Sequence, residues 1–182
     1  MVKDLDIVPE CYIDTNLVET LLELGHCKTD GVNHQKGCNT VVNVMKTKFG
    51  DCFALGVVDA DKRRLSYLDD CQELASSEHI VLMKHPEKQH FFLLIKPAMD
   101  TLILKAAKEA EVNLSDYDLP VEFEAFKDVA KRVDSKKDSR FKRLFAAIRS
   151  AKEMVILARV LTYLHAHKYD SEKEEVLKGF FV

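Results

Sequence analysis

The segment FALGVVDADKRR, residues 53–64, sets the architecture that this sequence predicts. Its first part, residues 53–58, is an unbroken apolar run that stops at two aspartates, Asp59 and Asp61. Three cations follow directly, namely Lys62, Arg63 and Arg64. A short apolar run that ends at charged residues is typical of a central strand buried on both faces. We therefore expect residues 53–58 to form the middle of a sheet.

The two aspartates come where open α/β sheets place their chemistry, just past the carboxyl end of a strand. If the chain stays extended there, Asp59 and Asp61 point to the same side and Ala60 points away. Two converging carboxylates repel each other unless a cation lies between them, and hard oxygen ligands favour magnesium, manganese or calcium over zinc. An ordinary acidic turn gives the same local pattern, because aspartate is a common turn residue.

Composition indicates a globular domain. The chain has 182 residues, of which 47% are hydrophobic and 31% are charged, and its formal net charge is −3. This length is enough for one domain with a sizeable core. The net charge argues against a surface that is basic all over, although it leaves room for a local basic face.

The cysteines and the amino terminus predict a cytoplasmic protein. The five cysteines are scattered and include no CxxC pair, so we expect reduced thiols rather than disulfides or a zinc site. The first residues lack the apolar core of a signal peptide, and no run is long enough to cross a membrane. We expect no membrane partner.

The order of predicted elements favours an α/β fold. We expect a strand at 7–11, a helix from Asp14 or Thr15 to Gly25, a polar loop at 26–37 and a second helix ending near Gly50. After the central strand come a helix at 66–76 and strands at 80–83 and 91–95, which a turn could join as a hairpin. Helices fill most of the remainder. The prediction is a mainly parallel sheet flanked by helices over residues 1–96, with a helical extension, residues 97–182, packed on it.

A basic segment lies in this helical extension. Between residues 127 and 152 there are ten cations and three acids. The cations are Lys127, Lys131, Arg132, Lys136, Lys137, Arg140, Lys142, Arg143, Arg149 and Lys152, and the acids are Asp128, Asp134 and Asp138. Such a segment is suited to a phosphate backbone and predicts nucleic acid as a partner. A solvated helix face is the alternative.

The first strand completes a recognisable pattern. In VPECYIDTNLVETLL, residues 8–22, Glu10 stands at a predicted strand end, Asp14 follows four residues later, and an amphipathic helix comes next. Together with GVVDADK, residues 56–62, this resembles the two motifs of Toprim domains, the magnesium-dependent catalytic modules of topoisomerases, bacterial primases and many nucleases. The likeness covers about residues 5–96. One departure is Cys11, which stands where the family has a glycine.

The resemblance implies a metal-dependent active site. It implies that Glu10, Asp59 and Asp61 hold one or two magnesium or manganese ions with Asp14 nearby, and that Glu10 moves the proton. Lys36, Lys62, Arg63 and Arg64 are the candidates for holding the phosphate, since cations bind phosphate oxygens. No GxxxxGK[ST] phosphate loop occurs, so an ATPase that drives such a nuclease would be a separate chain.

Two alternatives remain open. The string YIDTN, residues 12–16, also resembles the start of PIN-type ribonucleases, in which a strand-end aspartate, here Asp14, anchors the metal. A non-catalytic module that binds a partner protein or nucleic acid is the other alternative, and Cys11 favours it. Among the histidines, His34 is the candidate of interest, because its loop is expected to border the cleft; a plain surface role is its alternative.

Overall fold

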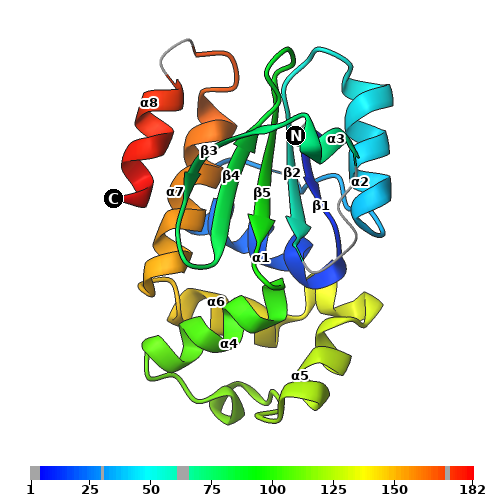
Figure 1. Ribbon diagram of the computed structural model, residues 1–182. Helices are drawn as coiled ribbons and strands as arrows, with labels where there is room; N and C mark the ends of the chain where they lie inside the picture. The colour runs from blue at the N-terminus through cyan, green and yellow to red at the C-terminus, as the bar shows by residue number, and fades with distance from the viewer. Residues whose placement is uncertain (1–4, 30, 61–65, 171–172) are drawn as a thin grey trace.

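A five-stranded mixed sheet, in the order β1-β2-β5-β4-β3, forms the centre of the protein (Figure 1). The computed structural model describes residues 5–29, 31–60, 66–170 and 173–182. The strands are β1 (Ile7–Pro9), β2 (Ala54–Asp59), β3 (Gln72–Ser76), β4 (Ile80–Lys84) and β5 (His90–Ile95). The predicted central strand is confirmed, because β2 lies between β1 and β5 and pairs parallel with both.

Helices surround this sheet. The α-helices are α1 (Tyr12–Leu24), α2 (Cys38–Val44), α3 (Ser66–Asp69), α4 (Met99–Glu109), α5 (Phe123–Ala130), α6 (Ser139–Ala147), α7 (Lys152–Ala166) and α8 (Lys173–Lys178). A π-helix, η1 (Met45–Phe49), continues α2, and short 3-10 helices occur at η2 (Leu114–Tyr117), η3 (Val133–Lys137) and η4 (Gly179–Phe181). Figure 1 shows α4, α5 and α6 gathered beyond the arrowheads of β2 and β5.

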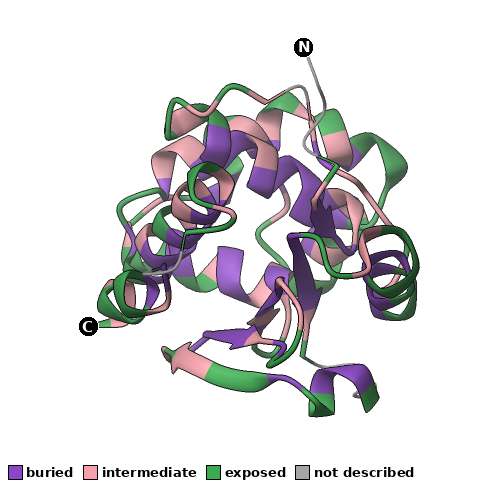
Figure 2. Cartoon of the chain, turned by 90° about the horizontal axis from the view of Figure 1, so that it is seen from above, coloured by how far each residue is buried: buried purple, intermediate pink, exposed green. Residues whose placement is uncertain are grey.

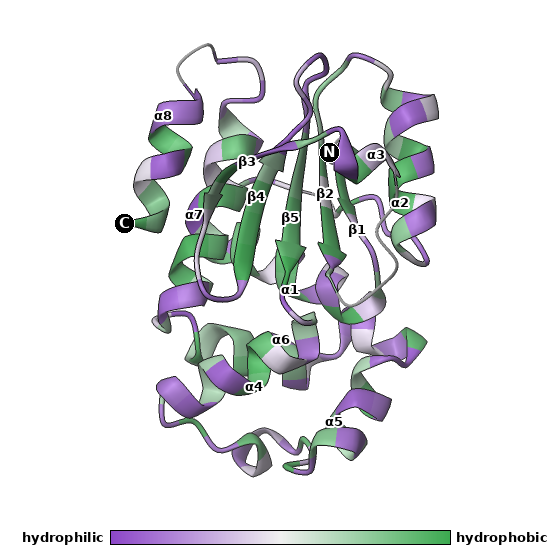
Figure 3. Cartoon of the chain, in the orientation of Figure 1, coloured by the Kyte–Doolittle hydropathy of each residue, from purple (hydrophilic) through white to green (hydrophobic). Residues whose placement is uncertain are grey.

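Alternation along β2 produces two cores, one on each face of the sheet. Leu55 and Val57 belong to a large cluster that also contains side chains of α1, α4, α6 and α7. Ala54 and Val58 belong to a smaller cluster that contains side chains of α2 and α3. Strands β1, β2, β4 and β5 are apolar over most of their length (Figure 3), and the helices turn their buried residues towards the sheet (Figure 2).

The prediction of a mainly parallel sheet is wrong. Strand β4 runs antiparallel to both of its neighbours, β3 and β5. The reason is the short connection between β4 and β5, because a tight turn can only return the chain antiparallel, whereas a parallel pair needs a long crossover. The hairpin expected from the two apolar runs at 80–83 and 91–95 is present.

The helix predicted at 66–76 is also wrong in its second half. Helix α3 ends at Asp69, and residues 72–76 form the edge strand β3, which has a register shift between Glu73 and Ala75. An edge strand with one side open to water needs few apolar residues, and of these Leu74 packs on the large core. The polar composition that suggested a surface helix fits this strand equally well.

Gly56 in β2 leaves room for the large side chains of Phe92 and Met45. A Cβ atom at this position would lie 2.7 Å from Cδ1 of Phe92 in β5 and 3.0 Å from Sδ of Met45. Any larger residue would therefore force Phe92 out of the smaller core.

The helical region after β5 shares the larger core with the sheet. Phe126, Phe141 and Leu157 belong to the same buried cluster as Leu55 and Leu93. Helix α7 is the longest of the described helices, and none of them combines the length and the apolar character that crossing a bilayer requires.

Candidate active site at the carboxyl edge of the sheet

Glu10 and Asp59 meet at what we call the carboxyl edge, where β1 and β2 end and α1 and α4 begin. The backbone N–H of Asp59 donates a hydrogen bond of 3.0 Å to Oε2 of Glu10. Glu10 is only 1% exposed, whereas Asp59 is half-buried. Because β1 and β2 are adjacent and parallel, their carboxyl ends necessarily lie side by side.

Helix α4 directs its amino terminus at Asp59. The backbone N–H of Met99, the first residue of α4, donates a hydrogen bond of 2.9 Å to Oδ1 of Asp59. The first N–H groups of a helix have no partner within the helix, and the helix dipole favours negative charge there. Asp59 is therefore held by the helix that begins after β5, which the sequence motif does not include.

Cys11 and Asp14 form the first turn of α1. The backbone N–H of Cys11 donates a hydrogen bond of 3.2 Å to Oδ2 of Asp14, as in a capping box. Cys11 has φ −135° and ψ 179°, an extended conformation that any residue can adopt, so its backbone does not require the glycine of the Toprim motif. Burial raises the pKa of the Cys11 thiol, and the nearby carboxylates of Asp14 and Asp59 raise it further. The thiol is therefore protonated at neutral pH.

A polar segment, residues 33–36, lies beside these residues, along β1 and over α1. The backbone N–H groups of Asn33 and Gln35 donate hydrogen bonds of 2.9 and 3.0 Å to the carbonyls of Ile7 and Pro9. Alternation along this extended segment places His34 over α1, where its ring stacks on Tyr12 with centroids 4.5 Å apart. The Nζ atom of Lys36 lies 5.8 Å from the centre of the Tyr12 ring.

The imidazole of His34 is neutral at pH 7. Burial lowers the pKa of His34, and the positive charges of Lys136 and Lys36 lower it further, while the Cys11 carbonyl acts in the opposite direction. Lys136 belongs to η3, far along the chain. The helical region therefore brings a cation to the edge that carries Glu10 and Asp59.

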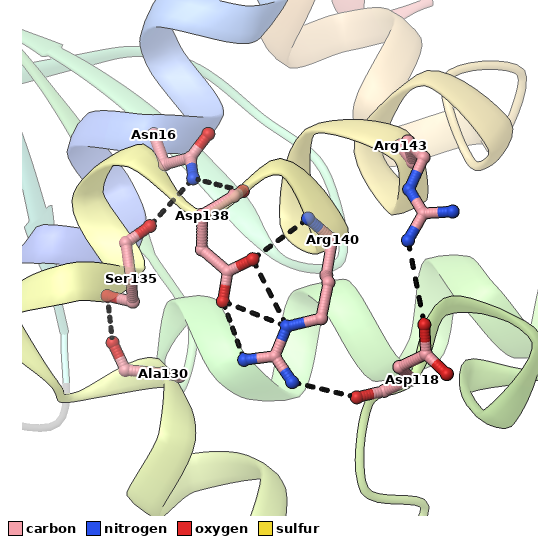
Figure 4. Close-up of polar contacts among 7 residues, drawn as sticks. All are labelled: Asn16, Asp118, Ala130, Ser135, Asp138, Arg140 and Arg143. Carbon is pink, nitrogen blue, oxygen red and sulfur yellow. Dashed lines mark hydrogen bonds and ion pairs between the residues drawn. The ribbon is translucent and has the colours of Figure 1, made fainter.

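Asn16 binds the backbone on either side of Lys136 (Figure 4). Its Nδ2 atom donates hydrogen bonds of 2.7 Å to the carbonyl of Ser135 and 3.1 Å to the carbonyl of Asp138. Ser135 in turn donates from Oγ to the carbonyl of Ala130 at 2.7 Å. The turn that contains Lys136 is thus tied to α1 at both of its ends.

The ten cations of the predicted basic segment divide into two groups. Four of them form ion pairs, namely Lys127 with Glu124, Arg140 with Asp138, Lys142 with Glu23, and Arg143 with Asp118. Arg140 lowers the pKa of Asp138 by direct hydrogen bonding, and Asp138 raises the pKa of Arg140. The other six make no ion pair within the described part of the chain: Lys131, Arg132, Lys136, Lys137, Arg149 and Lys152. Only this second group is suited to binding an external phosphate without first breaking an existing pair.

The predicted metal ligands are brought together only in part. Asp61 and the predicted phosphate ligands Lys62, Arg63 and Arg64 lie outside the described residues. Over residues 5–29, 31–60, 66–170 and 173–182, no three His, Cys, Asp or Glu side chains gather closely enough to hold a metal. Asp14 is 1% exposed and caps α1 with one carboxylate oxygen. The described acids by themselves therefore do not form an all-protein cage.

Magnesium does not need such a cage. It is commonly bound by one or two carboxylates, with water and substrate phosphate completing its six ligands. The Glu10 carboxylate lies against the backbone of Asp59, whose own carboxylate is at the same edge, and among the described residues no three His, Cys, Asp or Glu side chains gather as a zinc site would require. The donor set fits a weakly held magnesium or manganese ion.

Comparison with known proteins gives no further guide, because no family model, curated protein or solved structure matches this chain. The assignment of the site therefore depends on its own geometry.

Sequence reasoning missed two contributors to the site. One is the amino terminus of α4, although Pro97 correctly predicted that a helix begins there. The other is Asn16, a buried polar residue that accepts a hydrogen bond from Thr20, one turn later on α1. Two polar residues spaced four apart within an apolar helix are a signal that this face packs on something polar.

Proposed function

We propose that this protein is a metal-dependent nuclease that hydrolyses phosphodiester bonds at the carboxyl edge of its sheet. The observation that carries the proposal is the hydrogen bond from Asp59 N to Glu10 Oε2, which joins two residues 49 positions apart in the chain. One acid from each of the two Toprim-like motifs thus lies next to the other, and this supports a shared ion.

The residues of the chain have distinct roles in this proposal. Glu10 and Asp59 would hold the divalent ion, and Met99 N keeps the Asp59 carboxylate in position. When bound, such an ion would supply orientation of the phosphodiester and activation of the attacking water. Glu10 takes a proton from that water as its oxygen bonds to phosphorus. The bond to the leaving oxygen breaks, and solvent protonates that oxygen. The cations without ion pairs, among them Lys136, hold the strand.

A cleavage assay tests this function. Wild-type protein is incubated with mixed RNA and DNA substrates in magnesium or manganese, beside Glu10→Gln, Asp59→Asn and the control Asp116→Asn. Asp116 is an exposed residue of η2, away from the site. We expect cleavage by the wild type and the control, and none by the two site variants. Cleavage that survives in both site variants would exclude this site as its source.

The PIN-type alternative makes the opposite prediction for the acids. Asp14 lies within the first turn of α1, beyond the end of β1 at Pro9, and not at a strand end. An Asp14→Asn variant keeps an oxygen that can accept from Cys11 N, so α1 remains capped. We expect Asp14→Asn to retain cleavage and Glu10→Gln to lose it; the reverse result would favour a PIN-type site.

A second candidate function is nucleic-acid binding without cleavage. The described acids form no group of three, and the Cys11 thiol lies beside Asp14 and Asp59, where the Toprim motif has only a hydrogen atom. Wild-type protein that binds nucleic acid but cleaves it in neither metal would support this candidate. In that case Cys11→Gly tests whether the thiol blocks the ion, which calorimetric titration with manganese would detect.

A further inference from the structure

The segment that packs over α1 contains a hydrogen-bond acceptor without a donor. Nε2 of His34 is buried and has no hydrogen-bond partner among the described residues. A buried polar atom without a partner is costly and calls for an explanation. One explanation is that a ligand supplies the missing group once the side chains that cover this atom turn aside.

The hydrogen bonds of Thr15 determine which nitrogen of His34 carries the proton. Thr15 Oγ1 donates its one hydrogen to the carbonyl of Cys11 at 2.7 Å. The same oxygen lies 2.9 Å from Nδ1 of His34, so in this contact it must accept. Nδ1 therefore carries the hydrogen in the neutral ring, and Nε2 presents a lone pair. The ligand that completes this site must offer an O–H or N–H donor.

Positive charge flanks the same ring. Lys36 lies over Tyr12, on which His34 stacks, and Lys136 is close enough to act on the imidazole electrostatically. Neither lysine makes an ion pair with a described residue, and both have long side chains that can turn towards an anion. Together these groups suit a ligand that carries a phosphate and, beside it, a hydroxyl donor. A ribonucleotide has both, whereas a deoxyribonucleotide within a strand lacks the 2′-hydroxyl.

We propose that His34 selects RNA over DNA, with Nε2 accepting a hydrogen bond from a ribose 2′-hydroxyl while Lys36 and Lys136 hold the adjacent phosphate. This inference rests on the proposed function, because it names the substrate class of the same site. The 2′-hydroxyl is the group by which proteins distinguish the two nucleic acids. His34 acts as a specificity residue and takes no part in moving protons.

Binding measurements without divalent metal separate this inference from catalysis. Fluorescence anisotropy in EDTA compares single strands of one sequence as RNA, DNA and 2′-fluoro RNA. The 2′-fluoro strand keeps the sugar conformation of RNA but has no hydrogen to donate. We expect RNA to bind about tenfold tighter than either of the other two strands, the difference that one buried hydrogen bond makes.

Two variants of His34 sharpen the test. Asn reaches only the position of Nδ1, so His34→Asn keeps a donor for Thr15 but removes the acceptor at Nε2. Gln reaches the position of Nε2, so His34→Gln restores an acceptor there. We expect His34→Asn to bind RNA only as tightly as DNA, and His34→Gln to keep most of the preference. Thermal melting confirms that both variants are folded.

The outcomes are distinguishable. Equal affinity of the wild type for RNA and DNA, or a preference that His34→Asn retains, would overturn this inference and leave the nuclease proposal standing on its cleavage assay. Tight binding of 2′-fluoro RNA would also overturn it, because shape rather than the hydroxyl would then be recognised. Absence of binding to every strand, together with absence of cleavage, would overturn both proposals.

Discussion

The two ends of the sheet differ in how their polar groups are satisfied. At the amino edge, where β1, β2 and β5 begin, the carboxyl-terminal part of the chain supplies the partners. Tyr169 accepts a hydrogen bond of 3.0 Å from Phe53 N, Lys168 pairs with Asp6 at 2.6 Å, and Lys173 donates to Gln89 at 2.9 Å. At the carboxyl edge the acids are held by backbone N–H groups, and a histidine acceptor and several cations have no partner among the described residues.

This difference separates stability from function. Most groups of the amino edge bond within the protein, although Asp6 Oδ1 and His90 Nε2 are buried without a partner among the described residues. Removing the contacts that do form should lower the free energy of unfolding. At the carboxyl edge a histidine nitrogen and several cations are available to bind a ligand. Functional sites of this kind commonly lower the stability of the fold. Substitutions at the two edges should therefore affect different measurements.

The largest expected effect is on catalysis at the carboxyl edge. In Glu10→Gln the amide oxygen can still accept from Asp59 N, so the fold is preserved, but the charge that holds the ion is lost. We expect the cleavage rate to fall about 1,000-fold, which corresponds to about 4 kcal/mol in the barrier. Urea unfolding in EDTA should show a change within about 0.5 kcal/mol. If the variant unfolds instead, Glu10 has a structural role like that of the contacts at the amino edge.

The next effect is the pH dependence of stability, which depends on His90 at the amino edge. Burial lowers the pKa of His90 from 6.5 to about 4, with Lys88 and His85 adding to the shift. Tyr67 Oη lies 2.6 Å from Nδ1 of His90. Because the unfolded chain takes up a proton below pH 6.5 and the folded protein does not, stability should fall as the pH drops from 6.5 towards 4. The loss from this one group reaches about 3 kcal/mol.

A comparison with His90→Gln isolates this contribution from that of the carboxylates. Urea unfolding at several pH values should give the wild type a steeper loss between pH 6.5 and 4 than the variant. Parallel slopes would mean that His90 is protonated within the fold, and that the amino edge also holds an unused titrating group.

A smaller loss is expected when a buried lysine is removed from the amino edge. Lys173 is 4% exposed and donates to Gln89 Oε1 at 2.9 Å and to the carbonyl of Lys168 at 3.0 Å. Lys173→Met leaves both acceptors without this donor, so we expect a loss of about 2 kcal/mol. Lys178→Met is the matched control, because Lys178 is exposed and pairs only with Glu175. Cleavage should be unchanged in both, and a loss of activity in Lys173→Met would show that the two edges are coupled.

The smallest effect tests a single hydroxyl. Tyr169→Phe leaves the N–H of Phe53 without its acceptor, and we expect a loss of about 1 kcal/mol in urea unfolding. Tyr117→Phe removes a hydroxyl that forms no hydrogen bond with any described residue and should have no effect. Equal stabilities of the two variants would mean that water hydrogen-bonds to Phe53 N in place of the hydroxyl. The amino edge would then be more accessible to solvent than its contacts indicate.

The sequence by itself determined the local features of the site. The apolar run at 53–58 fixed β2 as a central strand, and the positions of Glu10 and Asp59 at strand ends followed from where the apolar residues stop. These features can be predicted from short stretches of sequence, because the apolar residues on the buried face of a strand or helix recur at a short, regular spacing. The hairpin signal at 80–95 was also present in the sequence. Because a hairpin adds an antiparallel pair, a mixed sheet could have been predicted from it.

Only the tertiary structure decided which distant groups meet. Nothing near Asp59 in the sequence indicates that Met99 N would hold its carboxylate, and nothing near His34 indicates Lys136. The hydrogen bond from Met99 and the electrostatic influence of Lys136 on His34 both arise because the helices after β5 fold back over the carboxyl edge, where Asn16 ties η3 to α1. Contacts of this kind depend on how whole faces pack together, and a residue's neighbours in sequence carry little information about that.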